Sequence, residues 1–114
     1  MSEENSKGTV NNGSDMTVTD KEITNFKAAL YIDGNDDDTM ISDYIKTAKQ
    51  YVQNAVSPTA DLAKYQQYDF AVQMLSQFWY QNRGIDMVKT PYQVLSMIQQ
   101  LRGMVDWFTN VRLV

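Results

Sequence analysis

An acidic segment, DGNDDD, begins at Asp33 and groups the side chains best suited to hold a metal ion. A calcium-binding EF-hand loop needs oxygen ligands at its positions 1, 3 and 5, glycine at position 6 and a bidentate Glu at position 12. Asp33, Asn35 and Asp37 match the first three positions, but Asp38 stands at position 6 and Tyr44 at position 12. The segment therefore fails where chelation matters most. Carboxylates that precede a helix are favoured by its dipole, and this structural role is the one expected here.

Other side chains offer little for catalysis. The sequence has no His and no Cys, which removes the commonest general base, the commonest metal ligand and any thiolate site. No Gly-rich phosphate loop, nucleophile elbow or pair of catalytic carboxylates stands out. A site built on carboxylates, Lys or Tyr remains open in principle. We expect a protein that is not an enzyme, with no catalytic residue, no metal and no cofactor.

The charge of the chain suits nucleic acid poorly. Affinity for DNA comes mainly from Lys and Arg that neutralise phosphates, whereas this chain has 10 Lys and Arg against 14 Asp and Glu, a formal net charge of −4. The basic residues are scattered and form no stripe. A small helical regulatory or nucleic-acid-binding module remains the alternative function. It would need the third and fourth predicted helices to form a helix-turn-helix, although the turn between them is longer than usual.

The ends of the chain differ in character. Residues 1–18 are polar and small, so they predict a disordered tail, and they lack the apolar centre of a secretory signal. No apolar run is long enough to cross a bilayer. We therefore expect synthesis in the cytoplasm and no membrane contact.

The spacing of apolar residues predicts four helices. The first begins at Thr19, which has capping-box spacing to Glu22, and ends at Gly34, a residue suited to a left-handed cap. The second follows the acidic turn and ends at Pro58. It carries the clearest apolar stripe, with Lys46, Lys49 and Gln53 assigned to the other face; the stripe comprises Met40, Ile41, Tyr44, Ile45, Ala48, Tyr51, Val52 and Ala55.

The third helix, over about 60–82, has two apolar faces and is therefore expected to be central. The fourth opens at Thr90-Pro91, a capping residue followed by proline at the first helical position, and ends at Gly103. The residues after Gly103 are apolar or aromatic and lack a helical stop. The predicted fold is all-α: a small bundle of about four helices with a disordered N-terminal tail and an extended C-terminal tail.

The third helix ends in the aromatic run FWYQNR. Phe78 and Trp79 lie on the apolar stripe and are expected in the core. Tyr80 and Arg83 point elsewhere, and aromatics beside Arg are typical of interface anchors and of platforms for single-stranded nucleic acid. We take Tyr80 and Arg83 as interface candidates.

Two further pairs are interface candidates. Phe70 and Met74 form the narrower apolar face of the third helix, and Trp107 and Phe108 lie in the C-terminal segment. Exposed aromatics must be covered or they promote aggregation. Whether Trp107 and Phe108 fold back on their own domain or dock on a neighbour, for instance as an added strand, is open.

The order of these pieces resembles the head–tail connector (adaptor, or DNA-packaging) proteins of tailed bacteriophages, over residues 19 to about 103. Three segments carry the resemblance: ITNFKAALYIDGNDDDTMISDYIKTAKQYVQNAV, with its acidic turn; YDFAVQMLSQFWYQNRG, with an aromatic pair, Tyr, Asn and Arg near its end; and TPYQVLSMIQQLRG, ending in Leu-Arg. Tyr80 and Arg83 fall where the family has its helix-ending aromatic and Arg. The long polar N-terminus and the apolar extension after Gly103 depart from the pattern.

The resemblance implies a structural role without catalysis. It implies a homo-oligomeric ring, expected to be dodecameric as in the family, at the head–tail interface of the virion. Its partners would be the portal protein and a tail-side stopper or completion protein, and DNA would pass through without specific binding. The expected organisation is a tail over 1–18, a connector domain over 19–103 and an extension over 104–114 that contacts neighbouring subunits.

Overall fold

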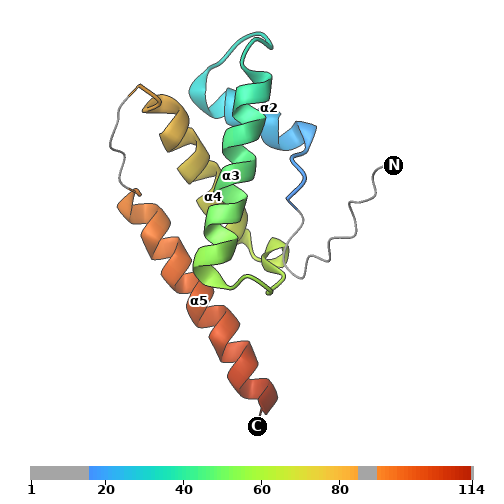
Figure 1. Cartoon of the computed structure of the whole chain (residues 1–114), viewed down its shortest axis with the longest axis vertical. Helices are drawn as coiled ribbons and strands as arrows, with labels where there is room; N and C mark the ends of the chain where they lie inside the picture. The colour runs from blue at the N-terminus through green and yellow to red at the C-terminus, as the bar shows by residue number, and fades with distance from the viewer. Residues whose placement is uncertain (1–15, 85–89, 114) are drawn as a thin grey trace.

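The computed structural model describes the backbone of residues 16–84 and 90–113, and side chains as far as Asp106 (Figure 1). Within these ranges the chain forms four α-helices and a 3-10 turn, and no strand: α2 (Asp20–Leu30), α3 (Asp38–Val56), η1 (Leu62–Lys64), α4 (Gln66–Gln81) and α5 (Tyr92–Leu113). The predicted all-α fold is confirmed. None of the helices described is both long and apolar enough to cross a membrane.

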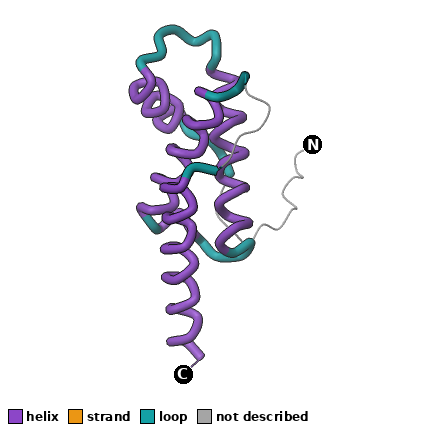
Figure 2. The backbone as a smooth tube through the Cα atoms, turned by 90° about the vertical axis from the view of Figure 1, so that its left-hand side faces the viewer, coloured by secondary structure: helices purple, strands orange, loops and turns teal. Residues whose placement is uncertain are grey.

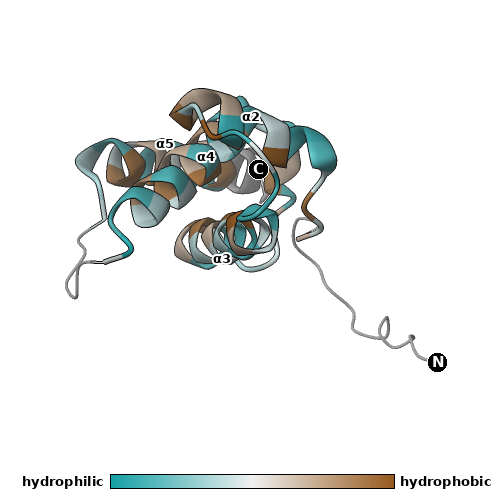
Figure 3. Ribbon diagram, turned by 90° about the horizontal axis from the view of Figure 1, so that it is seen from above, coloured by the Kyte–Doolittle hydropathy of each residue, from teal (hydrophilic) through white to brown (hydrophobic). Residues whose placement is uncertain are grey.

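Helix α4 is the central element. It packs against α2, α3, α5 and η1, and its most extensive contact is with α3. Seen from above, α4 lies between α3 on one side and α2 on the other (Figure 3). The two apolar faces of its sequence predicted this position, because a helix that buries more than one face needs neighbours on both.

Helix α2 begins as predicted but ends earlier. The Thr19 Oγ1 accepts from the Glu22 backbone N–H (3.1 Å), and Glu22 Oε1 accepts from the Thr19 N–H (2.8 Å), so the capping box is complete. The left-handed C-cap is Tyr31, with φ 58° and ψ 43°, and not Gly34. Gly34 also has a positive φ, 80°, but it lies in the turn that follows.

The core joins residues from all the helices. Its fully buried members include Phe26, Ile41, Ile45, Val52, Leu62, Leu75, Val94 and Leu101. Trp79 and Phe78, expected in the core, are only half-buried, whereas Tyr80 is 8% exposed. The Tyr80 ring packs edge-on against Phe26, with ring centroids 5.4 Å apart. Because of this contact with α2, the end of α4 buries Tyr80, whereas the helical spacing predicted that Phe78 and Trp79 would be buried.

Two polar residues of α3 are also buried against expectation. Lys49 and Gln53 were assigned to the solvent face, but only 5% of Lys49 is exposed and Gln53 is equally buried. The Gln53 amide donates to the carbonyls of Ser57 and Ala60, and so closes the turn after α3. Each side chain tolerates burial because its donors have partners.

Helix α5 corrects the expected extended C-terminal tail. The helix does not stop at Gly103 and continues to Leu113. A glycine inside a helix costs only about 1 kcal/mol relative to Ala, and no proline follows to end the helix. Met104 and Val105 pack partly against the core, which offsets that cost. The last part of α5 then extends past the other helices (Figure 2).

The N-terminal segment packs earlier than expected. Residues 1–15 lie outside the described part of the chain, so the expected tail is described only from Met16 onward. Val18 packs against the core, and the Thr17 carbonyl accepts from Lys49 Nζ (2.7 Å). The last residues assigned to a disordered tail therefore belong to the folded domain.

Candidate assembly surfaces

The acidic turn between α2 and α3 is tied to its own protein. Lys27 Nζ donates to Asn35 Oδ1 (3.0 Å) and to Asp38 Oδ1 (2.8 Å), while Asp37 Oδ2 accepts from the Tyr80 hydroxyl (2.6 Å). Among the residues that the structure describes, no group of three or more acidic side chains is arranged to hold a metal ion. The carboxylates near the start of α3 thus connect it to α2 and α4.

Tyr80 and Arg83 close the end of α4 together. The Arg83 guanidinium lies 4.1 Å from the centre of the Tyr80 ring, and its Nη1 donates to the Tyr80 carbonyl. The hydrogen bond to Asp37, together with burial, raises the pKa of the Tyr80 hydroxyl, and Arg83 opposes that rise. Tyr80 therefore offers a partner little surface, whereas Arg83 is exposed.

A partly buried ion pair, which the sequence did not suggest, joins the start of the domain to α3. Lys49 Nζ lies 3.0 Å from Glu22 Oε2 and also donates to the Thr17 carbonyl. The Gln73 amide donates to the backbone carbonyl of Glu22 (3.3 Å). Burial, and then the Glu22 carboxylate, raise the pKa of nearby Asp69, while Lys49 lowers it. The one local signal was the position of Lys49 directly after the buried Ala48, at the edge of the apolar stripe.

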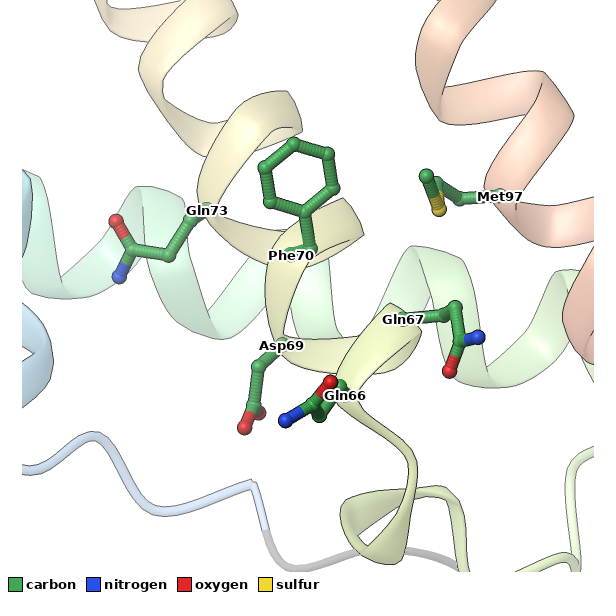
Figure 4. Close-up of a pocket in the computed structure, with 6 residues that line it drawn as sticks. All are labelled: Gln66, Gln67, Asp69, Phe70, Gln73 and Met97. Atoms are coloured by element: carbon green, nitrogen blue, oxygen red, sulfur yellow. The ribbon is translucent and has the colours of Figure 1, made fainter.

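The first apolar surface is a groove between α4 and α5. We call it the α4–α5 groove; its volume is about 500 Å³ and it is lined by Gln66, Gln67, Asp69, Phe70, Gln73 and Met97. Phe70 projects from α4 and Met97 faces it from α5 (Figure 4). Phe70 is 53% exposed, whereas Met74, the other residue of the predicted second face, packs partly against the core. Of that pair, Phe70 is the residue that a partner can reach.

A second apolar surface was missed by the sequence analysis. This α3–α4 groove has a volume of about 310 Å³ and is lined by Met40, Asp43, Tyr44, Thr47 and Trp79. Trp79 lies edge-on to Tyr51, with ring centroids 6.0 Å apart, and the Tyr51 hydroxyl shares a hydrogen bond with Thr90 Oγ1 (3.0 Å). The spacing Met40, Tyr44, Thr47, Tyr51 along α3 could have indicated it, because these residues share one side of the helix.

Trp107 and Phe108 fall in the last part of α5. The backbone there is helical, so docking as an added strand is excluded for this conformation. Their side chains lie outside the described part of the chain, and their contacts stay a prediction.

These features define a class of protein: a small all-α domain that keeps apolar grooves on its surface after its own core is complete. Each groove combines Met and aromatic side chains, which are enriched at protein interfaces, with polar residues that include one Asp. The chain belongs to the phage gp6-like head-tail connector protein family, whose model matches residues 20–106. It is therefore a structural protein of the phage head–tail connector class and not an enzyme. No curated protein and no solved structure matches it.

Proposed function

We propose that this protein is one subunit of a ring that assembles on the portal, completes the DNA-filled head and receives the tail. The observation that carries the proposal is the family match over residues 20–106, which covers nearly all of the helical domain. The partners would be further copies of the chain, the portal protein and a tail-side stopper or completion protein.

The surface of the domain supports this proposal. In a cyclic ring each contact joins two different patches of the same subunit. Two separate apolar grooves remain open on the domain, one between α4 and α5 and one between α3 and α4. Helix α5 also continues past the packed body (Figure 2), which gives each subunit an element that can reach a neighbour or the portal.

The exposure of each candidate side chain decides the role that we propose for it at the interface. Phe70 and Arg83 are exposed and can meet a partner directly, whereas Met74 packs partly against the core and Tyr80 is buried. Trp107 and Phe108 lie in the projecting part of α5, and we propose that they contact a neighbouring subunit or the portal.

The charge of the chain supports a passage for DNA that does not grip it. Each phosphate contact by Lys or Arg adds affinity, and affinity slows DNA that has to slide. With a formal net charge of −4 and dispersed basic residues, the subunit is suited to repel the DNA backbone.

Electron microscopy of the full chain mixed with the portal protein of the same phage tests the proposal. We expect closed rings seated on the portal. The subunit alone is the control, and we expect it to stay monomeric, because we expect ring closure to need the portal as a template. A persistent monomer with no affinity for the portal contradicts the proposal.

A further inference from the structure

We propose that Phe70 of one copy inserts into the α3–α4 groove of the next copy in the ring. The inference rests on the proposed function, because it assigns the contact between neighbouring subunits of that ring. It is drawn from the exposure of Phe70, from the shape of the groove and from their positions on opposite sides of α4.

Phe70 is an aromatic side chain that its own domain leaves uncovered. It belongs to the central helix, yet 53% of it is exposed, and Met97 beside it on α5 does not cover it (Figure 4). The exposed part of the phenyl ring gains nothing from the fold, whereas aromatic side chains are enriched at the centres of protein interfaces. Phe70 is therefore the protruding partner of the contact.

The α3–α4 groove is the receiving partner. At about 310 Å³ it is at the small end of pockets that hold a ligand, which suits one large side chain. Its walls are already held in place, because Trp79 packs edge-on against Tyr51, and Tyr44 packs edge-on against Tyr80 with centroids 6.2 Å apart. A preformed groove loses little side-chain entropy when it is filled.

The positions of the two surfaces favour a second copy of this chain as the occupant. Phe70 and Trp79 are nine positions apart on α4, about two and a half helical turns, so they leave the helix on opposite sides. A ring subunit needs complementary patches on opposite flanks, since each copy must offer one patch to each neighbour. Phe70 and the α3–α4 groove meet this requirement within one chain.

The polar groups around the two surfaces restrict how the contact forms. The amide side chains of Gln67 and Gln73 lie beside Phe70 and can donate hydrogen bonds to Asp43, which lines the α3–α4 groove. The Asp69 carboxylate also lies beside Phe70, and it would repel Asp43 at close range. The contact therefore requires that the amides, and not Asp69, face Asp43.

The contact is small compared with a stable interface, which typically buries about 1,200–2,000 Å². We therefore expect it to form only when the portal holds neighbouring copies together and raises their effective concentration. The test must use assemblies on the portal.

Because this chain has no Cys, cysteines introduced by mutation are the only thiols of the subunit and allow a direct test. Gln66 lies one helical turn from Phe70, and Thr47 lines the groove; both are exposed, so Gln66→Cys and Thr47→Cys leave the core and Phe70 intact. The double variant is assembled on the portal and treated with a short bis-maleimide. We expect a ladder of covalent multimers. Either single variant should give none, and an equal mixture of the two should give dimers only.

Two controls tie the ladder to Phe70. The first control is the double variant Thr24→Cys, Thr47→Cys, which gives the background level of cross-linking because Thr24 is an exposed residue of α2. The second control adds Phe70→Ser to the Gln66→Cys, Thr47→Cys variant, and the ladder should fall to that background level. Rings that give no ladder overturn the inference and leave the proposed function standing. Dimers from either single variant do the same, because they indicate a contact between identical patches. If no rings form, the proposed function fails and the inference with it.

Discussion

At the scale of one residue, Tyr31 has an unfavourable backbone conformation that the fold retains. Its backbone is in the left-handed region, φ 58°, where a residue other than Gly costs about 1–2 kcal/mol. Tyr31 is also 92% exposed, so packing within the domain does not offset that cost. The turn that follows α2, and not the conformational preference of Tyr31, therefore determines where the helix ends.

Tyr31→Gly should therefore stabilise the folded domain, by about 0.5–1 kcal/mol after the larger unfolded-state entropy of Gly is counted. Urea denaturation measures the change in the free energy of unfolding. The matched control is Thr24→Gly in the exposed middle of α2, which should lose about 0.3 kcal/mol, because Thr is itself a weak helix former. Equal losses for both variants would show that Tyr31 has a favourable contact.

Asp69 should make the stability of the folded domain depend on pH. Asp69 is an exposed residue, but partial desolvation of its carboxyl group, and then Glu22, raise its pKa above the ordinary 3.8, so the folded state holds the proton more tightly than the unfolded chain. Its ionisation then costs stability at neutral pH and costs nothing below pH 3.8. We expect Asp69→Asn to raise Tm at neutral pH, and the gain to vanish in acid. Thermal melts over that range test this, with Asp43→Asn as the control; a gain that persists in acid indicates a change in packing.

At the scale of elements, α5 is the helix with two roles. Its first half carries Val94, Ile98 and Leu101 into the core, and its last part extends past the other helices (Figure 1). Gly103 lies between the two halves without ending the helix. The same element can therefore hold the domain together and reach beyond it.

Gly103→Ala tests that continuity. No heavy atom lies within 4 Å of the position that its Cβ would take, so the change should stabilise the domain by about 1 kcal/mol and raise its helicity. Circular dichroism and thermal melts measure both. Gly34→Ala is the control and should destabilise the domain, because its φ of 80° disfavours a side chain. A neutral Gly103→Ala would mean that the helix ends there in solution.

At the scale of the whole molecule, folding and assembly should be separable. The double change Trp107→Ala, Phe108→Ala should leave the helicity and Tm of the free subunit unchanged and should impair ring formation on the portal. Circular dichroism and electron microscopy of the same preparation measure the two effects. Leu101→Ala, in the core, should instead cost about 2–5 kcal/mol of stability. If the double variant loses stability as Leu101→Ala does, its two residues belong to the core.

Several features of this protein follow from its sequence alone. Periodic apolar spacing located all four helices, and the Thr19–Glu22 capping box located the start of the first, because both signals are local and lie within one or two helical turns. The absence of His and Cys argued against catalysis and metal binding, and the acidic composition argued against binding of nucleic acid. The order of the helical segments indicated the connector family, which the match over residues 20–106 shows.

Which side chains are buried at the edges of those stripes depends on contacts between elements that are far apart in the sequence. Tyr80 is buried, and Trp79 only half-buried, because Phe26 and Asp37, far away in the sequence, contact the Tyr80 ring and hydroxyl. Lys49 is buried because Thr17 and Glu22 supply its partners. Such choices depend on which groups another element brings within hydrogen-bond reach, and helical spacing carries no information about that.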